Sequence, residues 1–298
     1  MIIVIIGPTG IGKTKLSIAL AKYFNTEIIS GDSVQVYKEL NIGSAKATSQ
    51  EMEEIPHHLI NLYDPRDDFS VALYQTLVRN KIKDFKDRGL VPIIVGGTGL
   101  YIKSTLYDYN FSDSKRDPNI EEKYKEFTNY ELHNVLVKKD FESSKKIHLN
   151  NRKRVLQAIS RSELNKVSEN KNKDIKLYDF TLIGLTMERQ KLYELINARV
   201  DKMLEDGLID EVKNLYDKGI HSNSVSAIGY KELYKYFDAE WTLDEAIDKI
   251  KQHSRNLAKK QFTFFSNQFD CKWITVDLND FNKTIQDAIK IIESKKAT

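Results

Sequence analysis

The stretch "IIVIIGPTGIGKT", residues 2–14, decides the fold. Its five β-branched apolar residues predict a buried strand, and "TKLSIALAKYF" (14–24) predicts a helix directly after the loop. The loop fits the pattern G-x-x-x-x-G-K-[ST], in which backbone N–H groups and a helix N-terminus surround phosphate oxygens. A strand before the motif and a helix after it are the context that identifies a phosphate-binding loop.

Every position of this loop is a candidate phosphate contact. Lys13 would add a point charge, and the Thr14 hydroxyl is placed to ligate Mg²⁺. The motif does not identify the phosphate, because a nucleoside triphosphate and a diphosphate ester both fit the same loop. The candidate residues are Gly7, Pro8, Thr9, Gly10, Ile11, Gly12, Lys13 and Thr14.

The first hundred residues alternate strand and helix patterns. Short apolar runs at 27–30, 57–64 and 91–95 predict strands, and residues 70–89 predict a helix capped by Ser70. In the 14–24 helix, Leu16, Ala19, Leu20 and Tyr23 share one face. This alternation predicts an α/β fold, a P-loop-containing parallel sheet flanked by helices. The phosphate loop, Asp32 and "GGTG" (96–99) all follow strand ends, so we expect them on one rim.

An inserted helical domain is expected after this region. Residues 113–178 are rich in charged, Asn and Ser residues, and "RKRVLQAISRSEL" (152–164) has helical periodicity. A strand pattern returns at 179–187, followed by helices and a last strand at 272–278. We therefore predict a catalytic core of residues 1–112 and 179–298, with residues 113–178 inserted as a separate helical domain.

Composition limits the class of protein. The chain has 298 residues, a net charge of +3 and one cysteine, which suits a reducing cytoplasm. No apolar run is long enough to span a bilayer, and the apolar N-terminus lacks the basic segment of a signal peptide. Basic residues gather in the insertion and between Lys249 and Phe269, which suggests a polyanionic partner.

The acid at position 32 allows several interpretations. At a strand end, Asp32 is placed to act as a base near a bound phosphate ester, but it could instead cap a helix. Asp64 is an alternative strand-end acid for a nucleotide hydrolase. His57 and His58 are adjacent, so on a strand they would point to opposite faces, and we expect no metal site there.

Seven motifs in order carry a resemblance to a known family. They are "GPTGIGKT", "GDSVQVYKELNIGSAK", "PHHLIN", "GGTGLY", "RVDKMLEDGLIDEV", "AIGYKEL" and "LAKKQFTFF". Together they resemble the bacterial-type tRNA dimethylallyltransferases, also called tRNA isopentenyltransferases, over nearly the whole chain. The phosphate loop occurs in many families, whereas "DSVQVY" followed by "GGTGLY" and "AIGYKE" is highly specific.

The resemblance implies a reaction and roles. The family transfers a dimethylallyl group from dimethylallyl diphosphate to the N6 amine of the adenosine 3′ to the anticodon, in tRNAs reading codons that begin with U. It implies that residues 7–14 and Arg199 hold the diphosphate, with Mg²⁺ at Thr14. It further implies that Asp32 accepts the proton of the amine and that Thr98 contacts the same nucleotide.

A tRNA interface is implied in the same way. The expected partner is the tRNA anticodon stem-loop, bound by a monomeric cytoplasmic enzyme without a membrane segment. The implied contacts come from the 32–35 loop, "GGTG" and the insertion: Asp32, Ser33, Val34, Gln35, Thr98, Lys153, Arg154, Val155, Leu156 and Gln157. The chain has Gln157, and Glu121 or a neighbouring residue, where the family commonly has arginine.

Two other functions share some of these features. A P-loop kinase acting on a nucleoside or metabolite would use the same loop, with Asp32 as the base for a hydroxyl group. A nucleotide-switched RNA-binding protein would need the loop and the basic insertion but would leave Asp32 and Thr98 without a role. Neither alternative accounts for the ordered series of motifs.

Overall fold

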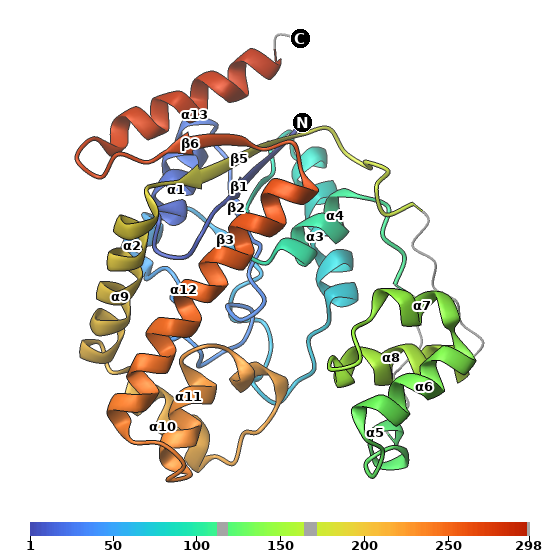
Figure 1. Ribbon diagram of the computed structural model, residues 1–298. Helices are drawn as coiled ribbons and strands as arrows, with labels where there is room; N and C mark the ends of the chain where they lie inside the picture. Colours follow the sequence, from blue (N-terminus) through green and yellow to red (C-terminus); the bar gives the residue numbers. More distant parts are fainter. Residues whose placement is uncertain (112–118, 164–171, 297–298) are drawn as a thin grey trace. The chain divides into compact units, whose positions relative to one another are not determined.

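The computed structural model describes residues 1–111, 119–163 and 172–296. Contacts divide the chain into two compact units, one of residues 1–106 with 176–298 and one of residues 107–175. The sheet of the first unit has six parallel strands in the order β3-β2-β4-β1-β5-β6, with helices on both sides (Figure 1). The expected α/β fold with a P-loop and a parallel sheet is confirmed.

The strands are short, and most match the predicted runs. They are β1 (Ile2–Ile6), β2 (Ile28–Ser30), β3 (His57–His58), β4 (Ile93–Gly96), β5 (Phe180–Thr186) and β6 (Lys272–Thr275). The run at 57–64 contains the expected third strand, which is only two residues long. It stops at His58 because Leu59 and Asn61 have left-handed backbones, with φ of 64° and 57°, which an extended strand does not allow.

Strand β1 lies in the middle of the sheet and explains its run of isoleucines. It pairs with β4 on one side and β5 on the other, and all five of its residues are buried. A central parallel strand is covered on both faces, so both sets of alternating side chains must be apolar. The register pairs Ile6 with Gly96, so β1 and β4 end at one level, whereas β5 continues for two residues beyond Gly184, the other partner of Ile6.

Helices cover the sheet and extend beyond it. In the first unit they are α1 (Lys13–Tyr23), α2 (Ser49–Met52), α3 (Val71–Asp87), α4 (Gly99–Leu106), α9 (Arg189–Glu205), α10 (Leu208–Asp217), a 3₁₀ turn (Asn223–Ser226), α11 (Tyr230–Phe237), α12 (Leu243–Gln268) and α13 (Phe281–Lys296). The Ser70 cap is confirmed, because its hydroxyl accepts a hydrogen bond from Leu73 N at 3.2 Å. None of the helices in the described ranges is both long and apolar enough to cross a membrane.

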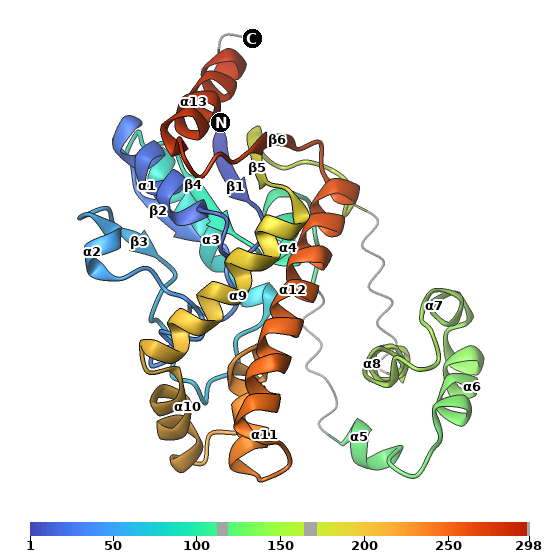
Figure 2. The same ribbon diagram turned by 60° about the vertical axis from the view of Figure 1, so that its left-hand side comes forward.

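The buried face of α1 differs from the one expected. Tyr23 is 52% exposed, whereas Ser17, Ile18 and Ala21 are buried together with Leu16 and Leu20. The reason is that α1 is covered on two sides. It lies against the sheet, and α13, which the sequence did not predict, packs against it from outside (Figure 2).

The second unit has its own apolar core. Its helices are α5 (Ile120–Lys123), α6 (Asn129–Lys139), α7 (Phe141–Lys146) and α8 (Arg152–Glu163). The core includes Leu132 and Leu136 of α6 with Val155 and Ile159 of α8. This part of the chain can therefore form a compact helical unit by itself.

The ends of this unit are joined by paired backbone segments. Asp108 N donates to Ile175 O at 2.9 Å, and Leu177 N donates to Leu106 O at 2.9 Å. The division therefore falls at 106/107 and 175/176, a few residues before the boundaries expected at 113 and 178. The pairing of Asp108 with Ile175 connects two segments that are far apart in sequence, which composition alone does not reveal.

Candidate active site

The loop between β1 and α1 is closed on itself by its lysine. Lys13 Nζ donates to Gly7 O at 2.9 Å and to Pro8 O at 2.7 Å. Burial lowers the pKa of Lys13 to about 7, with a further lowering from Arg199 and an opposing effect from Asp32. The lysine therefore lies where an anion would restore its charge and could replace the carbonyl oxygens as its partners.

Arg199 reaches the same loop from α9. Its Nη1 donates to Thr9 Oγ1 at 2.7 Å, across 190 positions of sequence. Burial also lowers the pKa of Arg199, against the opposing charges of Asp32 and Glu51. The structure thus brings Arg199 to the predicted phosphate loop, and within the described part of the chain no carboxylate bonds to either of the two cations there.

Asp32 follows β2 and caps a turn, not a helix. Its Oδ1 accepts hydrogen bonds from Val34 N at 2.8 Å and from Gln35 N at 3.3 Å. The two amides fix the carboxylate, and its charge raises the pKa of Lys13, Arg199 and Lys46. Asp32 therefore lies near enough to Lys13 and Arg199 for its charge to oppose the lowering of their pKa values by burial.

Thr98 lies beside Asp32 because β2 and β4 are neighbouring strands. Thr98 N donates to Gly31 O at 3.3 Å, and its hydroxyl donates to Ser33 Oγ at 3.4 Å. Gly31 N in turn donates to Val95 O at 2.6 Å. Thr98 is thus bonded to Gly31 and Ser33, the residues on either side of Asp32, which brings the predicted catalytic pair to the same turn.

Asp64, the alternative strand-end acid, has a different environment from Asp32. Asp64 is about half exposed, accepts a hydrogen bond from Arg66 N at 2.9 Å and forms an ion pair with the Arg66 guanidinium. This local turn uses the carboxylate of Asp64. Asp32 is the acid whose charge acts on Lys13 and Arg199.

The "GGTG" glycines are needed because other chain segments come very close. A β-carbon on Gly96 would lie 2.2 Å from Gly31 O, and one on Gly97 would lie 2.3 Å from Gln261 Nε2. A β-carbon on Gly99 would likewise meet the ring of Phe264. The motif therefore lets β2 and α12 approach the loop that carries Thr98.

Gln261 also lies beside the "GGTG" loop, although the sequence did not predict it as a site residue. Its Nε2 donates to Gly97 O at 3.2 Å, and its Oε1 is buried without a hydrogen-bond partner among the described residues. It belongs to "LAKKQFTFF", a motif that the sequence analysis quoted without assigning a role to the glutamine. The sequence feature that could have indicated Gln261 is its position as a polar residue on an otherwise apolar helix face.

Lys46 is a second missed residue, and it braces the loop after Asp32. Its Nζ donates to Tyr37 O, to Asn41 Oδ1 at 3.1 Å and to Asn61 Oδ1 at 2.7 Å. Burial lowers the pKa of Lys46 to about 8, against the charges of Glu211 and Asp32.

The side-chain amide of Gln35 makes its hydrogen bonds within the protein, to Ser30 Oγ and to two backbone carbonyls. A tRNA contact at Gln35 stays a prediction.

Glu211 holds the same loop from α10. Its carboxylate accepts hydrogen bonds from the backbone N–H groups of Asn41, Ile42 and Gly43 at 2.9, 2.8 and 3.1 Å, and from Tyr230 Oη at 2.7 Å. The motifs "RVDKMLEDGLIDEV" and "AIGYKEL" therefore support "NIGSAK" directly. The loop between Asp32 and Lys46 is held at both of its ends.

The predicted tRNA residues of the insertion divide into two groups. Lys153 and Arg154 are exposed on α8, and Gln157 is partly buried. Val155 and Leu156 are buried in the core of the second unit, with exposed fractions of 0% and 3%, because they lie on the inner face of α8. Their side chains are therefore core residues, and a tRNA contact at Val155 or Leu156 stays a prediction.

The two histidines are engaged separately. His57 Nδ1 lies 2.8 Å from Ile55 O, whereas His58 Nε2 lies 2.6 Å from Glu27 Oε2. Across the described residues, no cluster of three or more His, Cys, Asp or Glu residues is arranged to hold a metal ion.

Thr14 offers a different kind of metal ligand. Its exposed side chain lies in the first turn of α1, next to Lys13. Mg²⁺ is commonly held by one or two protein oxygens together with phosphate oxygens and water, and a single hydroxyl fits that pattern.

Comparison with models of known protein families identifies the family of this chain. The model of the IPP transferase family matches residues 35–268, and the model of the isopentenyl transferase family matches residues 1–64. The chain belongs to the IPP transferase family. The resemblance drawn from the motifs is thereby confirmed.

Curated relatives agree over nearly the full length. A tRNA dimethylallyltransferase of Bacillus cytotoxicus is 49% identical over 303 aligned residues, covering 99% of this chain and 95% of the relative. A tRNA dimethylallyltransferase of Bacillus subtilis is 49% identical and covers 91% of this chain and 90% of the relative.

Solved structures share the fold. The tRNA delta(2)-isopentenylpyrophosphate transferase of Staphylococcus epidermidis superposes with a TM-score of 0.75 at 43% identity, covering 99% of both chains. A eukaryotic dimethylallyltransferase described as acting on tRNA superposes with a TM-score of 0.82 at 30% identity, covering 99% of this chain and 79% of that one.

A substitution at Gly96 tests the contact between the two loops. We expect Gly96→Ala to lower the free energy of unfolding by about 2 kcal/mol or more, because its methyl group would displace the Gly31 carbonyl. Urea unfolding measures the loss, and hydrogen exchange followed by mass spectrometry should show faster exchange of the peptide that contains Gly31 and Asp32.

Gly89→Ala is the matched control. Gly89 has φ of 72° but no atom within 4 Å of the added carbon, so only the cost of the left-handed backbone applies, about 1 kcal/mol. The Gly31 peptide should keep its protection in this variant. Equal protection in both variants would show that the loop tolerates the methyl group.

Proposed function

We propose that this protein transfers the dimethylallyl group of dimethylallyl diphosphate to the N6 amine of the adenosine 3′ to the anticodon in tRNA. The acceptors would be tRNAs that read codons beginning with U. Membership of the IPP transferase family and relatives named tRNA dimethylallyltransferase support this reaction. The observation that carries it is the position of Asp32 after β2, a carboxylate that is held by turn amides and whose charge acts on the two cations of a phosphate loop.

The diphosphate would bind at the loop of residues 7–14. The backbone N–H groups of the loop, Lys13 and Arg199 would stabilise the negative charge that grows as the bond from carbon to oxygen breaks. Mg²⁺, when bound, would add charge neutralisation at the diphosphate, and the Thr14 hydroxyl is the residue that would hold it.

The amine needs a base because its lone pair is delocalised into the purine ring. As the N6 atom bonds to the allylic carbon, diphosphate leaves and the nitrogen has one proton too many. Asp32 would accept that proton. The two turn amides that bond to its Oδ1 hold the carboxylate in one orientation, and Thr98, joined to the same turn, would contact the target nucleotide.

The adenosine must leave its stack to reach this site. Enzymes that modify a base usually extrude it into a pocket, and a single-stranded loop makes this less costly than a duplex. Lys153 and Arg154, exposed on α8, would contact the phosphates of the anticodon stem-loop. We place the reaction in the cytoplasm and propose a monomer, with the free Cys271 in keeping with a reducing compartment.

Substitution of Asp32 tests the base. We expect Asp32→Asn to lower the rate of prenyl transfer to unmodified tRNA at least about a hundredfold, the scale typical of a lost catalytic base. Asn keeps an oxygen that can accept the hydrogen bonds from Val34 N and Gln35 N, so the turn should persist and tRNA affinity should change little. Radiolabelled prenyl transfer and filter binding measure the two quantities.

Asp64→Asn is the control for that experiment, because Asp64 caps a similar turn away from the loop. Its transfer rate should stay within about twofold of the unchanged protein, well below the effect of losing a catalytic base. A normal rate for Asp32→Asn would refute the role of Asp32.

Ligand-induced stabilisation separates the proposed activity from a kinase. Dimethylallyl diphosphate or pyrophosphate with Mg²⁺ should raise the melting temperature, since a ligand at a hundred times its Kd adds about 2.7 kcal/mol to stability. ATP should give a smaller rise at equal concentration, and both EDTA and Lys13→Ala should reduce the diphosphate effect. A larger stabilisation by ATP would instead favour a P-loop kinase.

Salt dependence tests the insertion. We expect Lys153→Ala and Arg154→Ala each to weaken tRNA binding and to reduce the slope of log K against log salt by about 0.7, as for a lost contact to single-stranded phosphate. Lys290→Ala, an exposed lysine on α13, should leave the slope unchanged. Identical slopes in all three variants would remove α8 from the proposed interface.

A further inference from the structure

The ring of a C-terminal phenylalanine lies directly against the phosphate loop. A β-carbon built on Gly12 would be 2.7 Å from Cε2 and 3.0 Å from Cζ of Phe281. These atoms are close enough to exclude any side chain at position 12. Gly12 is also the N-cap of α1 and has φ of 97°, a left-handed backbone. The contact is therefore made at the residue where the loop turns into the helix.

Phe281 is held in this position by the elements around it. It is the first residue of α13, and Asp280 Oδ1 accepts a hydrogen bond from Lys283 N at 3.3 Å, which caps the helix. Further along the same face, Thr284, Ala288 and Ile292 are buried. Both views show α13 beside α1 (Figures 1 and 2). Phe281 thus belongs to a helix that packs against the rest of the first unit.

The ring makes a second contact, with a lysine of α1. Lys15 Nζ lies 4.7 Å from the centre of the Phe281 ring, within range of a cation–π interaction. Lys15 belongs to the first turn of α1, two residues after Lys13. The ring therefore contacts both the turn before α1 and the first turn of α1.

This contact has a consequence for anion binding. A phosphate loop binds through backbone N–H groups that must all point inward, and Gly12 is free to adopt many other backbone conformations. A side chain packed against Gly12 restricts that freedom. A loop that is competent for only a fraction of the time binds with an apparent Kd raised by the inverse of that fraction.

We propose that Phe281 is a positioning residue for the phosphate loop, through which α13 sets the affinity for the diphosphate substrate. The proposal rests on the proposed function, since it takes a diphosphate as the ligand of the loop. Residue 281 lies outside the segments matched by the family models, 1–64 and 35–268, so no motif of the sequence points to it. Phe281 acts on the diphosphate through Gly12 and does not need to touch it.

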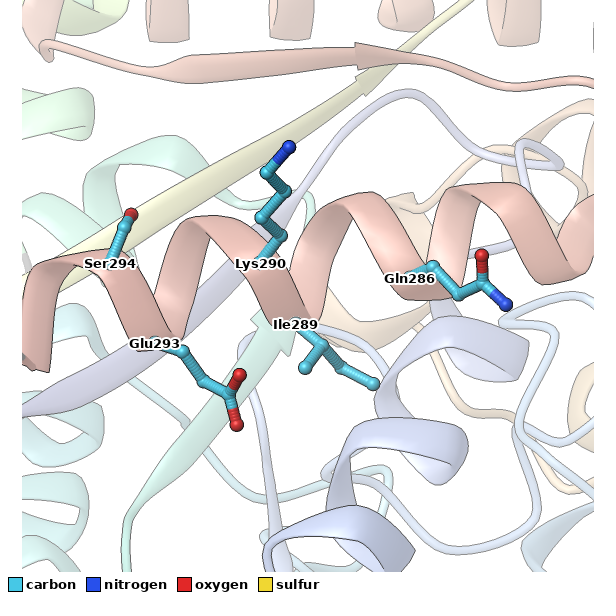
Figure 3. Close-up of a pocket in the computed structure, with 5 residues that line it drawn as sticks. All are labelled: Gln286, Ile289, Lys290, Glu293 and Ser294. Atoms are coloured by element: carbon cyan, nitrogen blue, oxygen red, sulfur yellow. The ribbon is translucent and has the colours of Figure 1, made fainter.

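The experiment compares Phe281→Ala, Phe281→Leu and Ile289→Ala in the full chain. Ile289 is the matched control, because it also packs against the core from α13 but lies two turns away, about 12 Å along the helix axis. It lines a hollow on α13 together with Gln286, Lys290, Glu293 and Ser294 (Figure 3). Both alanine variants weaken the packing of α13, and only one removes the contact with Gly12.

The quantities measured are kcat and the KM values for dimethylallyl diphosphate and for tRNA, together with pyrophosphate affinity by calorimetry with Mg²⁺. For Phe281→Ala we expect the KM for the diphosphate and the Kd for pyrophosphate to rise about tenfold, as for a loop competent about a tenth of the time. The KM for tRNA and kcat should stay within about twofold. Phe281→Leu should recover most of the affinity, because it again fills the space beside Gly12.

Three results would overturn the proposal. One is an unchanged diphosphate KM in Phe281→Ala, and another is an equal rise in Ile289→Ala, which would indicate general loss of packing. If Phe281→Ala does not fold, as judged by circular dichroism, Phe281→Val takes its place, because its short side chain also leaves the space of the ring beside Gly12 open. An unchanged diphosphate KM and pyrophosphate Kd in that variant is the third result. If the unchanged protein binds neither pyrophosphate nor dimethylallyl diphosphate, the proposed function fails as well, so the two failures are distinguishable.

Discussion

Parallel pairing of β2, β4 and β1 is the constraint on which the candidate site depends. Strands that run in one direction end at one edge of the sheet, so the loops that follow them must meet there. The register pairs Ser30 with Val95 and Ile6 with Gly96. Asp32, the "GGTG" turn and the phosphate loop are therefore neighbours, although up to about ninety residues separate them in sequence.

Two cations lie at this edge of the sheet. Lys13 bonds to backbone carbonyls and Arg199 to a hydroxyl, while the carboxylate of Asp32 acts on both through its charge. Burial lowers the pKa of both cations, so each is less stable as an ion than it would be in water. Binding of an anion would relieve this cost, which supports the proposal that the loop holds a diphosphate.

Support for these loops comes from distant helices. Glu211 of α10 binds three backbone N–H groups of the 41–43 segment, Gln261 of α12 binds the Gly97 carbonyl, and Phe281 of α13 covers Gly12. Each contact fixes backbone where the chain has glycine or irregular structure. The C-terminal third of the chain therefore acts as a scaffold that holds the loops of the first hundred residues.

Local patterns in the sequence determined the first strand, the phosphate loop, the Ser70-capped helix and the turn at Asp32, because each is set by neighbours within a few residues. The ordered motifs also identified the family. Tertiary structure decided the rest. The bond from Arg199 to Thr9 and the packing of Phe281 on Gly12 join residues about two hundred or more positions apart, and Val155 and Leu156 became core residues because α8 packs against α6. Such contacts depend on the path of the whole chain, since no local interaction brings these groups together.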